Sequence, residues 1–412
     1  MTTLNIKFRR LMARRGEEYD NGSLIVQDGL VKEIMRGPLE SFAGETVDLS
    51  DCLVLPGFVN LHCHLALSAL RGKTARGAAM ADWVRSVGEE DSALTLADRV
   101  REMRSGADTL VSSGVTTLAD YFRTSNPSLM EVYGSLPFRQ TLFLEVLGFQ
   151  EDRAPAIVKN LGSILADHVP KSPLINIGLA PHAPYSVSPA LFKETRKIAD
   201  QFAMPYSCHV AEFPEEIRFI KDGGGDMENL LRSRGKFDEN WQPPGVSPAQ
   251  YLDSLGVLGS LLGIHLSHVE ADLDLLAARS VAGAFCPGST RWFRRAQYMP
   301  VRQMLDRGMK VGLGADSLAS NESLNFLREL RLAEEMLPDV SRAEILEMAT
   351  AGGASALGLK TGVLVPGYPA DLIALRVSHP PANWHDSLFD PRRTQVDFAM
   401  IEGKIIRGQI FS

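Results

Sequence analysis

Apolar and polar positions alternate at both ends of this chain in the manner of short β-strands. Near the start, the apolar run 24–26 lies between Asn21-Gly22 and Asp28-Gly29, two dipeptides that favour tight hairpin turns. Beyond residue 359, the stretch 362–375 has the pattern of a turn followed by a strand, and 396–410 has that of a final hairpin. Both ends are therefore predicted to be β structure.

Between these ends, short apolar runs alternate with longer stretches of helical periodicity. We expect strands near 57–63, 115–119, 140–146, 175–181, 206–211, 261–267, 281–286 and 310–315. Helical patterns lie between them, among them 96–113, 189–202 and 301–307. Eight strand-then-helix units predict parallel strands with right-handed crossovers, and that number favours an α/β fold of the closed (β/α)8 TIM-barrel type.

The alternative fold is a doubly wound open sheet, which would more often carry a glycine-rich phosphate loop after its first strand. The only similar stretch, Gly223-Gly224-Gly225, follows a predicted helix and is typical of a loop. We therefore expect a catalytic barrel over residues 56–363. Residues 1–55 and 364–412 are expected to pack together as one small composite β-sandwich beside it.

Composition and charge remove several classes of function. Of 412 residues, 45% are hydrophobic and 23% are charged, as in ordinary globular proteins, and the net charge of −7 argues against nucleic-acid binding. No run of about 20 apolar residues predicts a membrane span, and residues 1–15 lack the apolar core of a secretory signal. The four scattered cysteines form no Cys-x-x-Cys pair, so we expect a cytoplasmic location, and a homo-oligomer is compatible with this composition.

The strongest chemical signal is His62-Cys63-His64, which ends the first strand of the predicted barrel. Residues two apart on a strand project from the same face, so both imidazoles would point one way and Cys63 the other. Two neutral imidazoles on one face provide half of a divalent-metal site, although such a pair is structural about as often. The other strand ends therefore decide between the two interpretations.

Six of the nine histidines fall at or just past the carboxyl ends of the predicted strands, where the active sites of (β/α)8 barrels lie. They are His62, His64, His182, His209, His265 and His268. Glu212 follows His209 by three residues, and Asp316 ends an apolar strand. Taken singly, His268 could be an ordinary core residue and Asp316 a helix cap. Taken together, the residues favour a metal site.

These motifs resemble the amidohydrolase superfamily, in its branch of aminoheterocycle deaminases and chlorohydrolases. The matching stretches span nearly the whole chain and are 56–64, 181–185, 209–212, His265, 314–317 and Ser320-Asn321. Within the branch, the chain is most similar to the aminodeoxyfutalosine deaminases, on the stretches 64–72, 183–189, 243–248 and 316–321. It departs from that pattern at Ala66, where the subgroup usually has glutamate, and at Ser289-Thr290, where the branch commonly has Ser-Asn.

The resemblance implies one divalent metal ion held by His62, His64, His209 and Asp316. Zn²⁺ suits three imidazoles and a carboxylate best, and Fe²⁺ is the alternative. Two-metal relatives carry a carboxylated lysine on the fourth barrel strand, and residues 174–185 contain no lysine.

Catalytic roles also follow from the resemblance. Asp316 would take a proton from the attacking water, His265 would hold that water in line, and Glu212 would deliver a proton to the substrate. His182 would hydrogen-bond the heterocycle. The implied reaction is hydrolytic deamination of an aminated purine nucleoside, a small-molecule substrate.

The favoured substrate is 6-amino-6-deoxyfutalosine, of menaquinone biosynthesis. Methylthioadenosine, S-adenosylhomocysteine, adenosine or a chlorinated triazine are alternatives, and a non-catalytic scaffold is least favoured because every ligand is present. Arg291, Arg294 and Arg295 follow the seventh strand together with Trp292 and Phe293. This stretch could be a solvated basic loop, or its arginines could bind the benzoate carboxylate of the substrate while Trp292 or Phe293 covers the ring.

Overall fold

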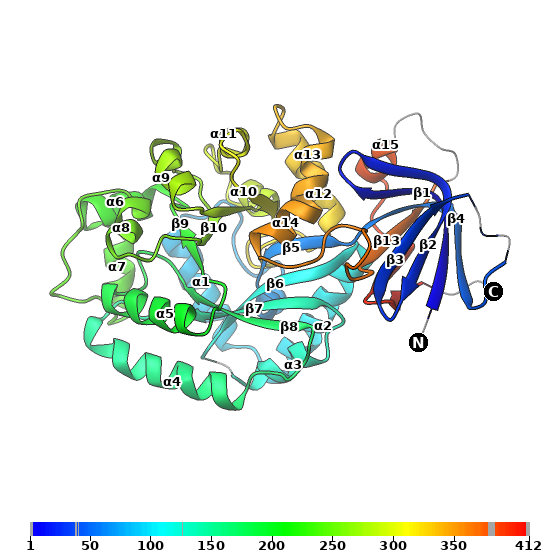
Figure 1. Ribbon diagram of the computed structural model, residues 1–412. Coiled ribbons are helices and arrows are strands. Elements are labelled where there is room, and N and C mark those ends of the chain that lie inside the picture. Colours follow the sequence, from blue (N-terminus) through cyan, green and yellow to red (C-terminus); the bar gives the residue numbers. More distant parts are fainter. Residues whose placement is uncertain (1–2, 38, 40, 126, 378–383, 409–412) are drawn as a thin grey trace.

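The computed structural model describes residues 3–37, 39, 41–125, 127–377 and 384–408. It places a large α/β body beside a smaller β-sheet that contains strands from both ends of the chain (Figure 1). None of the helices in this described part has the length and apolarity that a membrane-spanning helix needs.

Eight parallel strands form the centre of the larger body, which confirms the predicted barrel. They are β5 (Phe58–Cys63), β6 (Val115–Arg123), β7 (Arg139–Val146), β8 (Ile175–Pro181), β9 (Ser207–Val210), β10 (Leu262–His265), β11 (Ala282–Phe285) and β12 (Val311–Leu313). Hydrogen-bonded ladders join β5 to β8 and β9 to β12 as two four-stranded sheets. Single parallel bridges, Leu179 to Tyr206 and Cys63 to Asp316, connect the two sheets at both seams.

Most helices connect the barrel strands or cover the outside of the barrel, whereas α15 lies beside the smaller sheet (Figure 1). They are α1 (Met80–Ser92), α2 (Leu96–Ser112), α3 (Met130–Gly134), α4 (Ala154–Asp167), α5 (Pro189–Gln201), α6 (Pro214–Asp222), α7 (Gly225–Ser233), α8 (Pro248–Ser254), α9 (Leu273–Ala278), α10 (Pro287–Trp292), α11 (Val301–Asp306), α12 (Phe326–Met336), α13 (Arg342–Glu347), α14 (Gly353–Ala356) and α15 (His385–Phe389). Short turns of other helix types are η1 (Leu65–Leu70), η2 (Pro127–Leu129), η3 (Glu151–Arg153), η4 (Glu270–Asp272) and η5 (Met348–Gly352). Side-chain caps begin the predicted helices α2 and α5, where Thr95 and Ser188 accept backbone N–H hydrogen bonds.

The smaller sheet has seven strands in the order β15-β14-β13-β4-β1-β2-β3. Their bounds are β1 (Thr3–Arg14), β2 (Glu17–Gln27), β3 (Leu30–Arg36), β4 (Glu45–Pro56), β13 (Leu372–Arg376), β14 (Phe398–Ile401) and β15 (Lys404–Arg407). The edge strand β3 also bonds the segment before β13, since the Val31 N–H donates to the Tyr368 carbonyl at 2.8 Å. The sheet therefore curves over a single apolar core to which all of its strands except the edge strand β15 contribute buried residues.

One predicted hairpin turn is confirmed and the other is wrong. Asp28-Gly29 joins β2 to β3 with φ values of 49° and 82°, as a two-residue turn requires. Asn21-Gly22 instead lies inside β2, and the turn before it is Arg15-Gly16. At Gly22 a Cβ atom would lie 2.5 Å from the Phe8 ring, so the missing side chain serves close strand packing there. The final hairpin joins β14 to β15, and the last part of its predicted range, 409–410, lies outside the described residues.

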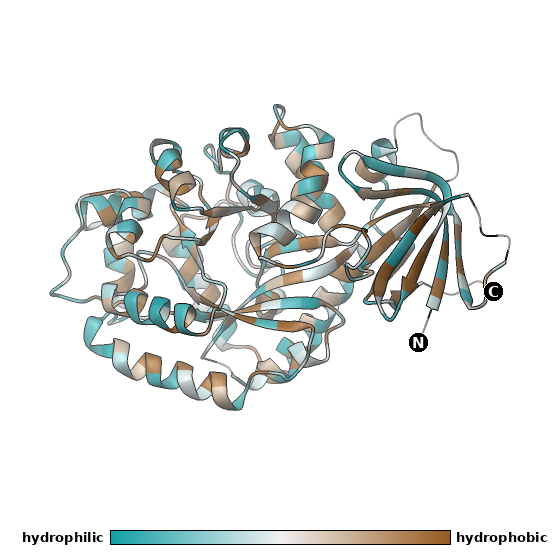
Figure 2. Cartoon of the chain, in the orientation of Figure 1, coloured by the Kyte–Doolittle hydropathy of each residue, from teal (hydrophilic) through white to brown (hydrophobic). Residues whose placement is uncertain are grey.

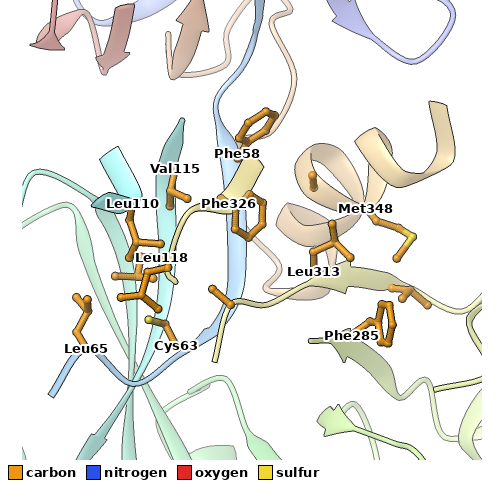
Figure 3. Packing of buried hydrophobic residues seen from close by; sticks show 14 of the residues in the cluster. Phe58, Cys63, Leu65, Leu110, Val115, Leu118, Phe285, Leu313, Phe326 and Met348 are labelled. Atoms are coloured by element: carbon orange, nitrogen blue, oxygen red, sulfur yellow. The ribbon is translucent and has the colours of Figure 1, made fainter. Parts of the chain in front are cut away.

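Apolar side chains fill the space between the barrel strands and the helices, and brown segments line these inner faces in Figure 2. Figure 3 shows Phe58 beside Phe326, and Leu118 beside Leu110, with Cys63 pointing into the same core. A separate cluster occupies the barrel interior and includes Tyr121. This packing leaves the carboxyl ends of the strands as the place where polar side chains can gather.

A buried ion pair connects the barrel to the smaller sheet. Arg139, at the start of β7, lies 2.9 Å from Asp371 and 2.8 Å from Glu402. Asp371 is almost completely buried and also accepts hydrogen bonds from the Thr361 hydroxyl and the Glu402 backbone N–H. Removing the arginine would leave a buried carboxylate without its cation.

Arg139→Met should therefore lower the free energy of unfolding by about 3 kcal/mol, the range found when one member of a buried pair is removed. Urea titration followed by circular dichroism measures this change. Arg279→Met is the matched control, because Arg279 also makes two contacts with one carboxylate, Asp253, but is half exposed. It should lose less than about 1 kcal/mol, and equal losses in the two variants would contradict the assigned role of Arg139.

Candidate metal centre and active-site cavity

The two histidines of the His-x-His pair project from the end of β5 to the same side, and Cys63 projects into the apolar core. His62 Nε2 lies 3.3 Å from His209 Nε2 and 3.6 Å from Asp316 Oδ1. One ligand atom each from His62, His64 and Asp316 lies within 4.8 Å of the others. For ligands about 2.0–2.1 Å from a tetrahedral ion, neighbouring ligand atoms lie about 3.3 Å apart. The cluster thus has the spacing of a divalent-metal site.

Backbone carbonyls orient two of these imidazoles. His64 Nδ1 lies 3.2 Å from the Tyr121 carbonyl, and His209 Nδ1 lies 3.0 Å from the His182 carbonyl. A carbonyl oxygen only accepts, so each Nδ1 carries the hydrogen and each Nε2 keeps its lone pair. This arrangement is typical of metal-binding histidines.

Charge states in the cluster also suit a cation. Burial alone would raise the pKa of Asp316, but the nearby imidazoles of His62, His265 and His64 hold it well below its usual value. Burial lowers the pKa of His62, His64 and His265. A carboxylate that ionises readily, beside imidazoles that lose their protons readily, is the donor set that Zn²⁺ and similar ions bind.

The strand ends that carry these residues have unusual backbone conformations. Asp316, His265 and Ala211 have φ values of 55°, 67° and 52°, in the left-handed region that residues other than glycine rarely adopt. Such conformations persist only where the surrounding structure holds them, and they cluster at functional sites. At the β5–β12 seam, the N–H groups of Ala315 and Asp316 both donate to the His62 carbonyl, at 3.0 and 2.9 Å.

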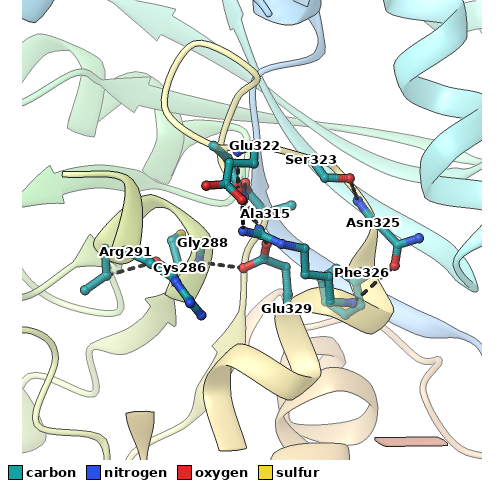
Figure 4. Close-up of polar contacts among 12 residues, drawn as sticks. Cys286, Gly288, Arg291, Ala315, Glu322, Ser323, Asn325, Phe326 and Glu329 are labelled. Atoms are coloured by element: carbon teal, nitrogen blue, oxygen red, sulfur yellow. Dashed lines mark hydrogen bonds and ion pairs between the residues drawn. The ribbon is translucent and has the colours of Figure 1, made fainter. Parts of the chain in front are cut away.

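A buried polar network supports the loop that follows Asp316 (Figure 4). The Asn321 amide donates to the Ala315 carbonyl at 2.8 Å and to Glu329 at 2.9 Å. Glu329, on α12, also accepts the Gly288 N–H at 2.7 Å, which ties the loop after β11 to the same helix. The Asn321 side chain therefore positions the neighbour of Asp316 and does not enter the cavity.

Glu212 and His265 face one another from β9 and β10, with 3.4 Å between His265 Nε2 and Glu212 Oε1. The Glu216 carboxylate anchors the backbone there by accepting the N–H groups of Ala211 and Glu212, at 3.0 and 2.9 Å. Burial raises the pKa of Glu216 to about 8, against the lowering effect of those two hydrogen bonds. Glu216 is thus a structural support, and Glu212 is the carboxylate that reaches the cavity.

A cavity of about 440 Å³ lies over this cluster. Six of the predicted site residues line it, namely His64, His182, His209, Glu212, His265 and Asp316. His62 is completely buried beneath them. His182 Nδ1 is hydrogen-bonded to the Ser186 hydroxyl at 2.7 Å, which fixes the ring beside His209. His268 lies beside a smaller cavity instead.

The expectation that the loop after the seventh strand lines the substrate cavity requires correction. This loop forms α10, and the turn of the helix directs Arg291 outward to Glu335, at 2.8 Å. Arg294 packs against Gly77, and Trp292 is buried outside the cavity lining. Arg295 pairs with Glu212. Of the residues predicted from this stretch, only Phe293, the alternative ring cover, contributes to the cavity wall.

Five charged cavity residues were not predicted. Arg123 and Glu145 end β6 and β7 and form an ion pair at 3.3 Å. Both lie at the carboxyl ends of barrel strands, where polar side chains of such folds gather, but neither lies next to a histidine in the sequence. Arg153, Arg234 and Lys236 come from connecting segments, where periodicity carries no information about the direction of a side chain.

Comparisons with known proteins agree with this geometry. Residues 53–406 match the Amidohydrolase family. The 5-methylthioadenosine/S-adenosylhomocysteine deaminase of Pyrococcus furiosus is 31% identical over 95% of this chain and 92% of its own length. The corresponding enzyme of Desulforudis audaxviator is 29% identical, over 94% and 90%.

Solved structures show the same fold. The aminofutalosine deaminase of Helicobacter pylori, in complex with methylthio-coformycin, has a TM-score of 0.84 at 21% identity and covers 98% of this chain and 100% of its own. An adenosine deaminase of Xanthomonas campestris with bound zinc has a TM-score of 0.79 at 24% identity, with coverages of 99% and 93%. The chain therefore belongs to the amidohydrolase family and is a hydrolase that acts on carbon–nitrogen bonds.

Proposed function

We propose that this chain is a metal-dependent hydrolytic deaminase of an aminated purine nucleoside. The observation that carries the proposal is the group of His62, His64, His209 and Asp316 beneath a cavity whose wall also presents Glu212 and His265. A metal-binding group, a proton carrier and an orienting imidazole are the parts that hydrolytic deamination of a heterocycle needs. The two curated relatives described above are both named deaminases, which supports this assignment.

The ion would be held by His62, His64, His209 and Asp316, and we propose Zn²⁺ on the basis of this donor set, with Fe²⁺ as the alternative. When bound, it would lower the pKa of a water molecule towards neutrality. The Asp316 carboxylate takes the proton of the attacking water, and His265 orients that water. This water adds to the amine-bearing ring carbon, so the adjacent ring nitrogen becomes basic.

Glu212 lies on the same side of the cavity as His265 and is the group that moves protons to the substrate. It protonates the ring nitrogen as water adds, takes up the proton that the hydroxyl group of the adduct loses as the carbonyl forms, and passes that proton to the amine, which leaves as ammonia. His182 follows the neighbouring strand β8, and its ring is fixed by Ser186. It hydrogen-bonds the heterocycle from that side. Each positioned acid–base group of this kind contributes about 10²–10⁴-fold to a rate.

For the substrate, we propose 6-amino-6-deoxyfutalosine, because the cavity wall contains cations without a carboxylate partner. Arg153, Arg234 and Lys236 line it, and within the described residues none of them lies within 4.0 Å of a carboxylate oxygen. Burial and the neighbouring charges of Arg123 and Arg85 lower the pKa of Arg234, so an anion nearby would stabilise this group. A benzoate supplies both an anion and a ring that could contact Phe149 or Phe293.

S-adenosylhomocysteine or methylthioadenosine is the second candidate, favoured by the names of the curated relatives. Methylthioadenosine carries no anion for Arg153, Arg234 and Lys236. S-adenosylhomocysteine carries a carboxylate, but its ammonium group would be repelled by the same cations. The cavity charges therefore favour a substituent that is anionic only.

We predict one metal ion per chain. Elemental analysis of purified protein should give a stoichiometry near one, and His209→Ala should lose most of the metal together with activity, because a catalytic site needs its protein ligands. His268→Ala is the control, since His268 lies outside the cluster, and it should keep both. A reproducible stoichiometry near two would contradict the mononuclear site.

Glu212→Gln should separate metal binding from proton transfer. The variant should retain the metal and unfold cooperatively at a lower temperature than wild type, because the buried Arg295 loses its charged partner. Its kcat should fall about 10²–10⁴-fold, because an amide cannot deliver the proton. Metal analysis, calorimetry and an ammonia-release assay measure the three quantities. Near wild-type turnover would show that another group is the proton carrier.

An ammonia-release screen across 6-amino-6-deoxyfutalosine, methylthioadenosine, S-adenosylhomocysteine and adenosine tests the substrate. The benzoate-bearing nucleoside should give the highest kcat/KM. Arg234→Ala or Arg153→Ala should lower that value about 10- to 150-fold, the worth of one charged hydrogen bond, and should change the adenosine value less than about threefold.

Arg291→Ala provides the matched control, because Arg291 is turned outward to Glu335. This variant should have the wild-type kcat/KM for both the benzoate-bearing nucleoside and adenosine. A wild-type preference for methylthioadenosine would rule out the aminodeoxyfutalosine assignment, whatever the arginine variants do.

A further inference from the structure

Arg295 makes a contact that the substrate-binding interpretation does not explain. Its guanidinium pairs with Glu212 Oε1, and its side chain is only 8% exposed. It also lies over the Phe293 ring, 4.8 Å from the ring centroid. Arg294, with φ of 53°, turns the chain so that Arg295 points inward from the end of α10. The arginine thus reaches the proposed proton carrier directly.

The backbone and the side chain of Glu212 are held by different residues. Ala211 and Glu212 donate their N–H groups to Glu216, so the main chain is anchored. In the described part of the chain, the polar contacts of the Glu212 carboxylate, to Arg295 and His265, both use Oε1. An anchored Oε1 leaves Oε2 as the oxygen that can exchange protons in the cavity.

We infer that Arg295 is a positioning residue that holds Oε1 of Glu212 so that Oε2 faces the reacting ring. The inference rests on the proposed function of Glu212. Arg295 does not line the main cavity but a second one of about 360 Å³, which shares Glu212 and Phe293 with the first. Its Nη1 is buried without a hydrogen-bond partner in the described residues. The guanidinium therefore acts on the substrate only through Glu212.

The second cavity supplies a direct experiment, because exposed residues such as Ala296 and Gln297 form part of its wall. A small cation can therefore enter from solvent once the arginine side chain is removed. In metal-loaded full-length protein, Arg295→Ala should lower kcat about 10²-fold, the loss that a misplaced catalytic group causes. KM and metal content should stay near wild type, and added guanidinium ion should restore part of kcat.

Arg294→Ala is the matched control, since Arg294 packs against Gly77 and not against Glu212. It should keep full activity and show no response to guanidinium. Arg295→Lys should retain more kcat than Arg295→Ala, because it keeps a cation near Oε1. Guanidinium should not restore Glu212→Gln.

The outcomes separate this inference from the proposed function. If wild-type protein releases ammonia and Arg295→Ala has the same kcat, the positioning role alone is overturned. A rise in the KM of Arg295→Ala with an unchanged kcat would also overturn this role, because Arg295 would then be a substrate ligand. If wild-type protein releases no ammonia from any aminated nucleoside, the proposed function fails. Crystal structures then still test the role of Arg295, because Glu212 should have one side-chain conformer in wild type and several in Arg295→Ala.

Discussion

Closure of the barrel between β12 and β5 is the constraint on which the site depends. Two consecutive N–H groups, of Ala315 and Asp316, donate to the single carbonyl of His62. This seam lies where the last strand of the barrel meets the first. A slip of one residue on a strand turns its side chains to the opposite face. The register of the seam therefore decides whether His62 and Asp316 meet at 3.6 Å or point apart.

The same seam explains the buried polar groups around it. A carboxylate removed from water is stable only if charges or hydrogen bonds replace its hydration. Asp316 has imidazoles on its cavity side, and its loop is held from behind by Asn321 and Glu329. Burial raises the pKa of Glu329 to about 7, against the lowering effect of the Asn321 hydrogen bond, so this support itself has an energetic cost. Rigid support of a strained residue is a requirement of the site, since Asp316 has a left-handed backbone.

The eight barrel strands could be predicted because each is a buried apolar run followed by an amphipathic helix. The predicted carboxyl ends of β5, β7 and β8 agree with the structure, but those of β6 and β10 do not. The sixth barrel strand is predicted over 261–267. In the structure this strand, β10, ends at His265, because the φ of 67° at that residue interrupts it. In the other direction, β6 continues past the predicted end at 119, because the buried Asp120 accepts hydrogen bonds from the Leu65 N–H and the Tyr133 hydroxyl. Polar residues inside a strand thus need partners that only the fold reveals.

The geometry of the cavity also shows why its chemistry is easier to predict than its specificity. The proposed metal-binding and proton-transfer residues lie on strands or one to three residues beyond them, so their direction follows largely from strand alternation and from the common orientation of parallel strands. Arg153 and Arg234 come from connecting segments, whose path depends on how α4 and α7 pack. A change in one connecting segment can replace these cations without disturbing the seam. The proposed reaction centre can therefore be kept while the charges of the cavity wall around it change.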